Sequence, residues 1–380
     1  MVLCGGEWAA MLIPSLVPRD RFPIVTHSCY LASHSLGAMP RQTPEVLEAY
    51  CKSWSEQGIL AWEGSWWDSL AEFSSAVEAV LDAPAETVVP CLNVTLAFAS
   101  IASCFEYDRR PKIVVSDLEF TTTLPFWLGQ RRLGAEVVVQ PAGALEEAID
   151  ERTALVISSH AFFRSGALQN LASLQARCRH VGASLVVDGY QSIGAVPFSV
   201  RDLDPDFVVG GCHKWLCGGP GGGFLYVRPC DLIPRLTGWF GLADPFAYQP
   251  GEAPMHPGAR RFLTGTPNVL GLFAAREGLK AIRELGISAI RAHSHQLTGQ
   301  ILSGAQARGL TIRTPLAPEE RNGMVCLDFE NAREAQRTLE RSRVIVDWRP
   351  DCGIRVSPHF YNDSGDVERF FEVLDQTLGS

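Results

Sequence analysis

Several features that would place a protein in a specialised class are missing from this 380-residue sequence. No apolar run approaches the roughly 20 residues that a membrane-spanning helix needs, so we expect no membrane association. A basic excess is also missing, since 33 Lys and Arg face 42 Asp and Glu and the formal net charge is −9. Nucleic acids and anionic membrane surfaces are bound by basic patches, so neither is an expected partner. Internal repeats and low-complexity tracts are absent too, which excludes a solenoid.

The eleven cysteines do not form a pattern that binds metal or builds a disulfide framework. They are odd in number and scattered, with no C-x-x-C pair and no cluster of His and Cys. Cys212 and Cys217 lie closest together, and they flank a lysine. We therefore expect reduced thiols, no metal and a cytoplasmic location. The N-terminal stretch MVLCGGEWAAMLIPSL lacks a basic start and a sustained apolar run, so we do not expect a signal peptide.

The sequence does have the composition and patterning of a globular α/β protein, with 46% hydrophobic and 20% charged residues. Short, nearly continuous apolar runs alternate with longer amphipathic stretches. Such runs are typical of parallel strands that are covered on both faces, so they predict a mainly parallel sheet of a seven-stranded type. The predicted strands are IVVSD (113–117), EVVVQ (136–140), ALVISSH (154–160), SLVVDGY (184–190), DFVVGG (206–211) and GFLYVRP (223–229).

The pattern of predicted helices and strands changes near residue 265. A long helical stretch, NVLGLFAAREGLKAIRELG, is followed by a smaller α+β segment that includes GMVCLDFE and RVIVDWRPDCGIRVSP. A single core rarely grows beyond about 250–300 residues, so the length suits two domains. We predict an N-terminal arm (1–50) that packs with the small domain, a large domain (51–265) and a small C-terminal domain (266–380).

The sharpest functional signal is VVDGYQSIGAVP followed by DFVVGGCHKWLCGGPGGGFLYV. Asp188 ends one predicted strand and Lys214 follows another, and ligands of α/β sheets bind at such carboxyl ends. A structural ion pair is the plain alternative. The order of Asp, His-Lys and glycine-rich turn resembles the pyridoxal-phosphate enzymes of fold type I. That resemblance implies that Lys214 holds pyridoxal 5′-phosphate as a Schiff base and that Asp188 pairs with the ring nitrogen.

Further motifs extend the resemblance over about residues 29–370 to the aminotransferase class V family, and within it to kynureninases. CYLASHSLGAMP resembles the N-terminal motif of those enzymes. LNVTLAF matches the turn that binds the cofactor phosphate, which implies roles for Leu92, Asn93 and Thr95. Free N–H groups and the helix dipole would favour a phosphate there. Asn93 could instead be a simple helix N-cap.

Other matches imply contacts with the cofactor ring. EFTTTLPFW places Phe120 over the ring, where an aromatic face fixes its tilt. AFFRSGALQN places the Ser165 hydroxyl near the cofactor, and Gln191 lies on the same side as Asp188. LTGWFG places Trp239 beside the cofactor, although a packed loop Trp explains it equally well.

The resemblance also implies a homodimer with shared active sites and an amino-acid substrate. RFLTGTPNVL resembles the segment that reaches the phosphate across the dimer interface, which puts Thr266 there. VDWRPDCGIRVSPHFYN resembles the strand and turn that bind the substrate carboxylate. Arg355 would supply the bidentate fork, and Arg349 would be a surface or structural partner.

Two departures from kynureninases bear on the reaction. Those enzymes carry a Tyr before the lysine and tend to carry a His where this chain has Gln191, whereas His213 precedes Lys214 here, as in desulfurases and epimerases of the family. A desulfurase needs a mobile loop cysteine, but Cys352 lies three residues before Arg355 and Cys326 falls in a predicted strand. We expect a lyase that cleaves a C–C or C–S bond in the side chain of its substrate, with Lys214 as the base and His213 bracing the ring or acting as a second acid–base group. An aminotransferase, an epimerase, a decarboxylation-coupled oxidative deaminase and a non-catalytic relative stay open.

Four tryptophans cluster early in the chain, at positions 54, 62, 66 and 67. They could shape the mouth of a pocket for a bulky substrate. The spacing of Trp62 and Trp66 is one helical turn, so we favour helix packing.

Overall fold

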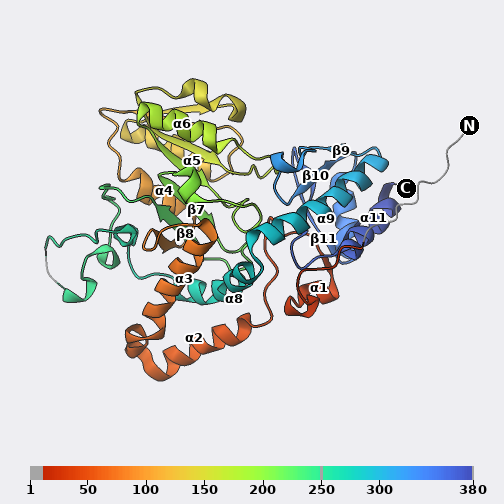
Figure 1. Cartoon of the computed structure of the whole chain (residues 1–380), viewed down its shortest axis with the longest axis horizontal. Coiled ribbons are helices and arrows are strands. Elements are labelled where there is room, and N and C mark those ends of the chain that lie inside the picture. Colours follow the sequence, from red (N-terminus) through yellow and green to blue (C-terminus); the bar gives the residue numbers. More distant parts are fainter. Residues whose placement is uncertain (1–11, 249–250, 379–380) are drawn as a thin grey trace, which may run out of the picture.

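The computed structural model describes residues 12–248 and 251–378, and a seven-stranded sheet forms its centre (Figure 1). The strand order is β2-β8-β7-β6-β5-β3-β4; β8 runs antiparallel to both its neighbours, and the other adjacent pairs are parallel. All six predicted strands are confirmed, as is the mainly parallel α/β fold. The strands are β2 (Val88–Cys91), β3 (Lys112–Ser116), β4 (Glu136–Gln140), β5 (Thr153–Ser159), β6 (Ser184–Asp188), β7 (Phe207–Gly211) and β8 (Gly223–Val227).

Helices cover this sheet, and together they form what we call the large body. Strands β3, β5 and β7 are buried along their whole length because helices and loops pack on both faces. Helix α4 packs on β7, α6 on β6 and α3 on β2, while α8 contacts both α2 and α3. The helices are α2 (Thr43–Gln57), α3 (Ser65–Leu81), α4 (Val94–Ala102), α5 (Thr123–Gly129), α6 (Leu171–Val181), α7 (Val200–Leu203) and α8 (Val269–Leu285).

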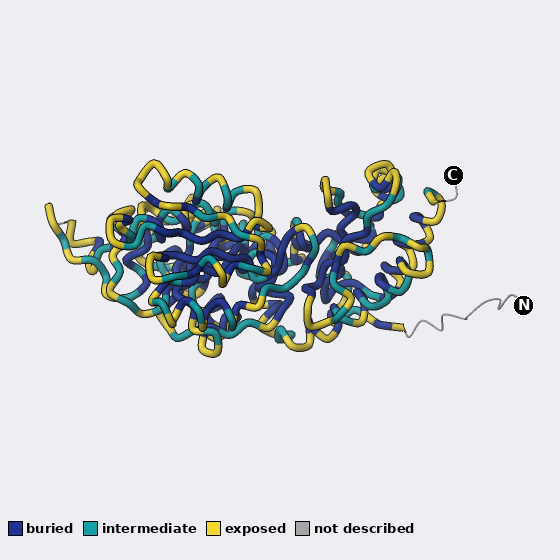
Figure 2. The backbone as a smooth tube through the Cα atoms, turned by 90° about the horizontal axis from the view of Figure 1, so that it is seen from above, coloured by how far each residue is buried: buried dark blue, intermediate teal, exposed yellow. Residues whose placement is uncertain are grey.

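A second, smaller core lies beside the large body, and we call it the small body. Its four antiparallel strands have the order β12-β13-β10-β9, and three helices pack with them. Figure 2 shows buried backbone concentrated in two regions, one for each body. The elements are β9 (Thr311–Ile312), β10 (Val325–Asp328), β12 (Asp347–Arg349), β13 (Gly353–Val356), α9 (Ile287–Ala307), α10 (Ala332–Arg341) and α11 (Ser364–Leu378).

The N-terminal segment runs along the small body before it enters the large one. It contains α1 (Ile24–His27) and β1 (Cys29–Tyr30), and β1 pairs in parallel with β11 (Val344–Ile345). The backbone N–H of Leu16 donates to the carbonyl of Phe360 at 2.8 Å, and Figure 1 shows α1 beside this body. Residues 1–11 of the expected arm, and with them most of the N-terminal stretch judged against a signal peptide, lie outside the described residues.

The division of the chain at residues 50 and 265 stays a prediction, and one helix bears on where the second boundary falls. Helix α8 starts just after residue 265, yet Leu272, Ala275 and Leu279 belong to the core of the large body. We therefore propose that the small body begins near Gly286, between α8 and α9. Nowhere in 12–248 or 251–378 is there a helix with both the length and the apolar character that crossing a bilayer requires.

Candidate active site

A cavity of about 530 Å³ opens at the carboxyl ends of the central strands, where they face the small body. Its lining comes from the turns after β3, β5, β6 and β7, from the start of α4, and from two segments outside the large body. The latter carry His34 and Ser35 from the N-terminal segment, and Arg349 and Arg355 from β12 and β13. Eight of the predicted site residues meet in this one cavity, namely Asn93, Thr95, Phe120, Asp188, Gln191, His213, Lys214 and Arg355.

Lys214 and Asp188 are both buried in the wall of the cavity. Burial lowers the pKa of Lys214 to about 8, although the Asp188 charge opposes that shift. Burial raises the pKa of Asp188 to about 6, while the N–H of Tyr190, 2.9 Å from Oδ1, and the Lys214 charge favour the carboxylate. No direct ion pair joins the two side chains in the described ranges, so the plain ion pair is not what holds them here. An amine and a carboxylate thus face the same space without neutralising each other by contact.

Aromatic rings surround the lysine. The Nζ atom of Lys214 lies 5.4 Å from the ring centre of Phe120 and 5.0 Å from that of Tyr190. Phe120 is 42% exposed and faces the cavity, so its ring is available to a flat ligand. Tyr190 fits because Gly211 has no side chain: a Cβ there would lie 2.2 Å from the Tyr190 Oη.

The other end of the cavity offers donors to an anion at the start of α4. Asn93 caps the helix, and its side chain accepts the N–H of Leu96 at 3.1 Å, so the N-cap alternative is confirmed. No acceptor within the described part of the chain reaches the N–H groups of Val94 and Thr95. The Thr95 hydroxyl lies 3.2 Å from that of Thr122, and both line the cavity. Unused amides at a helix start form a site for an anion such as a phosphate.

A second buried carboxyl group, Glu119, lies behind Asp188. It accepts hydrogen bonds from the Ser159 N–H at 2.7 Å and from the Ser159 hydroxyl at 2.6 Å. Ser159 is the partner of Asp188 across the β5–β6 pair. Burial raises the pKa of Glu119 to about 8, and the charge of Asp188 adds to the shift. Glu119 therefore holds a proton at pH 7, which leaves Asp188 as the charged member of the pair.

Two further polar residues that line the cavity with Lys214, His213 and Gln191, carry no charge near pH 7. Burial, and then the charge of Lys214, lower the pKa of His213 to about 4. The Gln191 side chain is tied to the protein, since its Nε2 donates to the His34 carbonyl at 3.1 Å and its Oε1 accepts from Trp215 at 3.2 Å. Gln191 thus fixes the N-terminal segment against the turn that carries Lys214.

Close backbone contact brings the N-terminal segment to the same turn. The Gly37 N–H donates to the His213 carbonyl at 2.8 Å. A Cβ on Gly37 would lie 2.1 Å from the Lys214 carbonyl oxygen, so only glycine allows this approach. The contact places His34 and Ser35 at the edge of the cavity.

The substrate end of the cavity is built around Arg355. Its Nε and Nη2 atoms form a two-point ion pair with Asp347, at 2.8 and 2.6 Å. Nη1 donates to the Phe163 carbonyl at 2.9 Å, and Nη2 reaches the Ser35 hydroxyl at 3.2 Å. Arg349 lines the mouth with a side chain that is 48% exposed, and it contacts Asp347 at 3.1 Å. Two guanidinium groups therefore meet one carboxylate.

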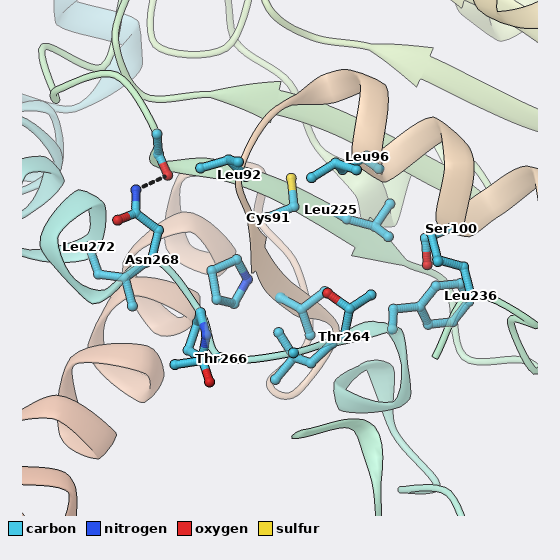
Figure 3. A pocket seen from close by; sticks show the side chains of 18 residues that line it. Cys91, Leu92, Leu96, Ser100, Leu225, Leu236, Thr264, Thr266, Asn268 and Leu272 are labelled. Carbon is cyan, nitrogen blue, oxygen red and sulfur yellow. Dashed lines mark hydrogen bonds between the residues drawn. The ribbon is translucent and has the colours of Figure 1, made fainter. Parts of the chain in front are cut away.

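Four of the predicted site residues lie away from this cavity. Leu92 and Thr266 line a second cavity of about 420 Å³, where Asn268 donates to the Gly221 carbonyl at 3.1 Å (Figure 3). Ser165 accepts the N–H of Ala167 at 3.2 Å within its own turn. Their cofactor contacts stay predictions.

Trp239, the fourth, lies among aromatic side chains. It contacts Phe240, Phe246 and Tyr248. Trp67 packs on Phe240 and Phe246 in the same cluster. This arrangement favours a packed loop Trp over a cofactor contact.

The other early tryptophans also pack on neighbours. Trp62 and Trp66 meet edge to face at 5.1 Å, and Tyr50 stacks on Trp66 at 5.4 Å. Trp54 is mostly exposed. Helix packing is thus confirmed for Trp62 and Trp66, although Trp62 belongs to the 3-10 helix Gly58–Glu63 that precedes α3.

Neither cysteine that was weighed as a sulfur carrier reaches the cavity. Cys326 lies within β10, as predicted, and is buried. Cys352 is buried too, and its thiol donates to the Arg164 carbonyl at 3.1 Å. Every cysteine in the described ranges is a free thiol.

Sequence reasoning missed several residues of the site. Glu119 and Tyr190 each stand beside a residue that was singled out, so their position after a strand could have marked them. Asp347 lies two residues before Arg349 in a strand, and alternation places the two on one face. His34 and Ser35 lie within the motif CYLASHSLGAMP, but the motif gave no role to either residue, because a pairing across more than 300 residues brings them to Asp347.

The residues of the cavity fit pyridoxal 5′-phosphate. Lys214 would supply an amine for its aldehyde, Asp188 a buried carboxylate for its ring nitrogen, Phe120 an aromatic face, and the start of α4 free donors for its phosphate. The fold and this site together define a pyridoxal-phosphate-dependent enzyme of fold type I. A sequence model of the aminotransferase class-V family matches residues 30–370, and the protein belongs to that family.

Several relatives match almost the whole chain. An uncharacterized aminotransferase of Bacillus subtilis, YcbU, is 29% identical over 372 residues, which cover 94% of this chain and 96% of the relative. A kynureninase of Stenotrophomonas maltophilia is 30% identical over 403 residues, covering 95% of both proteins. A kynureninase of Deinococcus radiodurans is 29% identical and covers 95% of this chain and 93% of its own.

Solved structures match the fold over nearly its full length. A cysteine desulfurase of Thermococcus onnurineus NA1 superposes with a TM-score of 0.83 at 21% identity, covering 95% of this chain and 97% of its own. The cystine C-S lyase C-DES, in complex with cysteine persulfide, superposes with a TM-score of 0.84 at 21% identity, covering 93% and 99%.

Proposed function

We propose that this enzyme is a lyase that acts on an amino acid and cleaves a C–C or C–S bond in its side chain, as a kynureninase or a cysteine S-conjugate β-lyase does. The observation that carries the proposal is that Arg355 and Lys214 line one cavity, so one small molecule can offer a carboxylate to the first and its α-carbon to the second. The kynureninase relatives support the lyase reaction.

The bound cofactor supplies an electron sink for the bond that breaks at the substrate's α- or β-carbon. Arg355 and Arg349 bind the carboxylate and thereby orient the α-carbon. Lys214, with a pKa of about 8, has a substantial neutral fraction near pH 7–8 and can accept and return a proton at its Nζ atom. His213 is neutral, so it can brace the ring or relay a proton. The Tyr190 hydroxyl lies against Gly211.

Transamination is the second candidate, because the relative from Bacillus subtilis is named an aminotransferase. An aminotransferase needs the same carboxylate fork and the same proton carrier. It would return the nitrogen to a keto acid instead of expelling a side chain.

The proposal is tested by supplying L-kynurenine to the protein loaded with pyridoxal phosphate. We expect water to be consumed and anthranilate and alanine to form, with anthranilate followed by its fluorescence. S-aryl cysteine, which would yield thiol, pyruvate and ammonia, is the parallel substrate. Keto-acid-dependent loss of an amino acid, with no product of either cleavage, would replace the lyase with an aminotransferase.

The pKa of Lys214 predicts how cofactor capture depends on pH. Only the neutral amine attacks an aldehyde, so the rate at which the cofactor-free protein takes up pyridoxal phosphate should rise with pH and level off above about 8. If the lysine had the ordinary pKa of 10.5, the rate would keep rising far above pH 8. Stopped-flow absorbance between about pH 6 and 10 measures the midpoint.

The same experiment has a directional control in Asp188→Asn. The Asp188 charge raises the pKa of Lys214, so removing that charge should move the midpoint to lower pH. A midpoint near 10.5 in the unaltered protein, or an upward shift in Asp188→Asn, would contradict the assigned electrostatics.

We also propose that the enzyme is a homodimer. Thr266 is exposed, and with Leu92 it lines a cavity that is separate from the Lys214 site of the same chain. Those positions suit a contact with the phosphate site of a second copy.

A further inference from the structure

The carboxylate of Asp347 lies at the centre of the polar groups that form the substrate end of the cavity. Its two oxygens accept hydrogen bonds from one edge of the Arg355 guanidinium, from Nε at 2.8 Å and from Nη2 at 2.6 Å. The Ser35 hydroxyl donates to it at 2.6 Å, and His34 Nε2 lies 2.9 Å from its Oδ1 atom. Arg349 reaches the same carboxylate from the cavity mouth. Asp347 itself does not line the cavity, so it acts through the arginines.

The charges at this end leave a single positive charge unmatched. Burial, and then the nearby Arg355, lower the pKa of His34 to about 4, so its ring is neutral near pH 7. Ser35 is neutral as well. Two guanidinium groups and one carboxylate then sum to one net positive charge, which one substrate carboxylate would neutralise.

The hydrogen bonds show which part of Arg355 is left for a ligand. Asp347 holds the Nε and Nη2 edge, and the Phe163 carbonyl takes one N–H of Nη1. The contact from Nη2 to Ser35 is the longest of the set, at 3.2 Å. A substrate carboxylate can replace the Ser35 oxygen there and use the remaining N–H of Nη1, while the exposed Arg349 closes over it.

We propose that Asp347 is a positioning residue that sets charge selectivity: it fixes Arg355 and cancels one of the two guanidinium charges, so that the site favours an amino acid with one carboxylate over an amino acid with two. This inference rests on the proposed function, because it assumes that an amino acid binds here. A second anionic group would find no unmatched cation and would lie close to Asp347, and like charges in a partly buried site repel.

The test compares L-alanine with L-aspartate as ligands of the protein loaded with pyridoxal phosphate. Binding is measured from the change in the visible absorbance of the cofactor as each amino acid is added. Asp347→Asn keeps the size of the side chain and removes its charge. We expect the affinity ratio of aspartate to alanine to rise about tenfold in this variant, which corresponds to about 1.4 kcal/mol. If Asp347 had a purely structural role, the substitution would weaken the binding of both amino acids alike and leave the affinity ratio unchanged.

Two further variants keep the test decisive. Arg349→Gln removes one cation, so the ratio should move in the opposite direction, toward alanine. Asp328→Asn is the matched control, because Asp328 pairs with Arg313 on the same small sheet but does not line the cavity; it should leave the ratio unchanged.

The outcomes separate this inference from the function on which it rests. If amino acids shift the cofactor spectrum but Asp347→Asn leaves the ratio as it was, the role of Asp347 is refuted and the proposed function survives. If no amino acid shifts the spectrum of the unaltered protein, the proposed function fails, and the inference fails with it.

Discussion

Alanine in place of Lys214 is expected to abolish turnover and the visible absorbance of the cofactor–lysine linkage. Among the described residues, Lys214 is the one lysine that lines the cavity. In the proposed reaction its amine both anchors the cofactor and moves the substrate proton. General acid–base groups contribute about 10²–10⁴-fold to rates, and the loss of the anchor adds to that, so we expect a drop in kcat of about 10³-fold or more. Steady-state rates and an absorbance spectrum of the purified variant measure both effects.

The control for this variant is Lys280→Ala, which removes an exposed lysine from α8 and should leave both readouts unchanged. Borohydride reduction of the unaltered protein should fix the cofactor on Lys214, and mass spectrometry of its peptides locates the modified residue. Normal turnover of Lys214→Ala, or modification of another lysine, would refute the assignment of the site.

The sequence predicts the sheet and the lysine end of the site well, because both depend on local patterns. Buried parallel strands appear as apolar runs, and the carboxyl ends of those strands meet at one edge. Asp188 ends one such run and Lys214 lies three residues after another, and both line one cavity in the structure. Phe120 lies a few residues beyond β3 and lines the same cavity. The cofactor roles expected of Asp188, Lys214 and Phe120, like the carboxylate role expected of Arg355, follow from the resemblance to the class V family.

The substrate end could not be read from the sequence, because contacts between distant segments build it. The partner of Arg355 is Asp347, and two residues that contact Asp347, His34 and Ser35, come from the N-terminal segment, more than 300 residues away. The pairing of β1 with β11, the hydrogen bond from Gln191 to the His34 carbonyl and the close approach of Gly37 help to bring them together. Thr266 shows the reverse case, since its expected contact with the cofactor phosphate belongs to the proposed second copy and so has no counterpart within one chain.

Alanine in place of Arg355 is expected to weaken substrate binding strongly while it lowers kcat less. The guanidinium is buried and would form a charge-assisted pair with the substrate carboxylate, and truncating such a partner costs about 2–5 kcal/mol. We expect KM to rise about 100-fold or more, measured with the substrate that the kynurenine assay identifies. Arg313→Ala is the matched control, because it removes an exposed arginine that pairs with Asp328 in the same small sheet. An unchanged KM would mean that the carboxylate is held elsewhere, with Arg349 as the next residue to replace.

Two effects can weaken substrate binding in Arg355→Ala, namely the loss of the guanidinium and repulsion by Asp347. A double variant separates them. Without Arg355, the Asp347 carboxylate loses its two-point partner and would repel the substrate carboxylate. In Arg355→Ala with Asp347→Ala that repulsion is gone. If repulsion contributes, the double variant should bind substrate better than Arg355→Ala alone, though still more weakly than the unaltered protein. If the two variants bind equally, the whole loss comes from the missing fork, and Asp347 acts on the substrate only by holding Arg355.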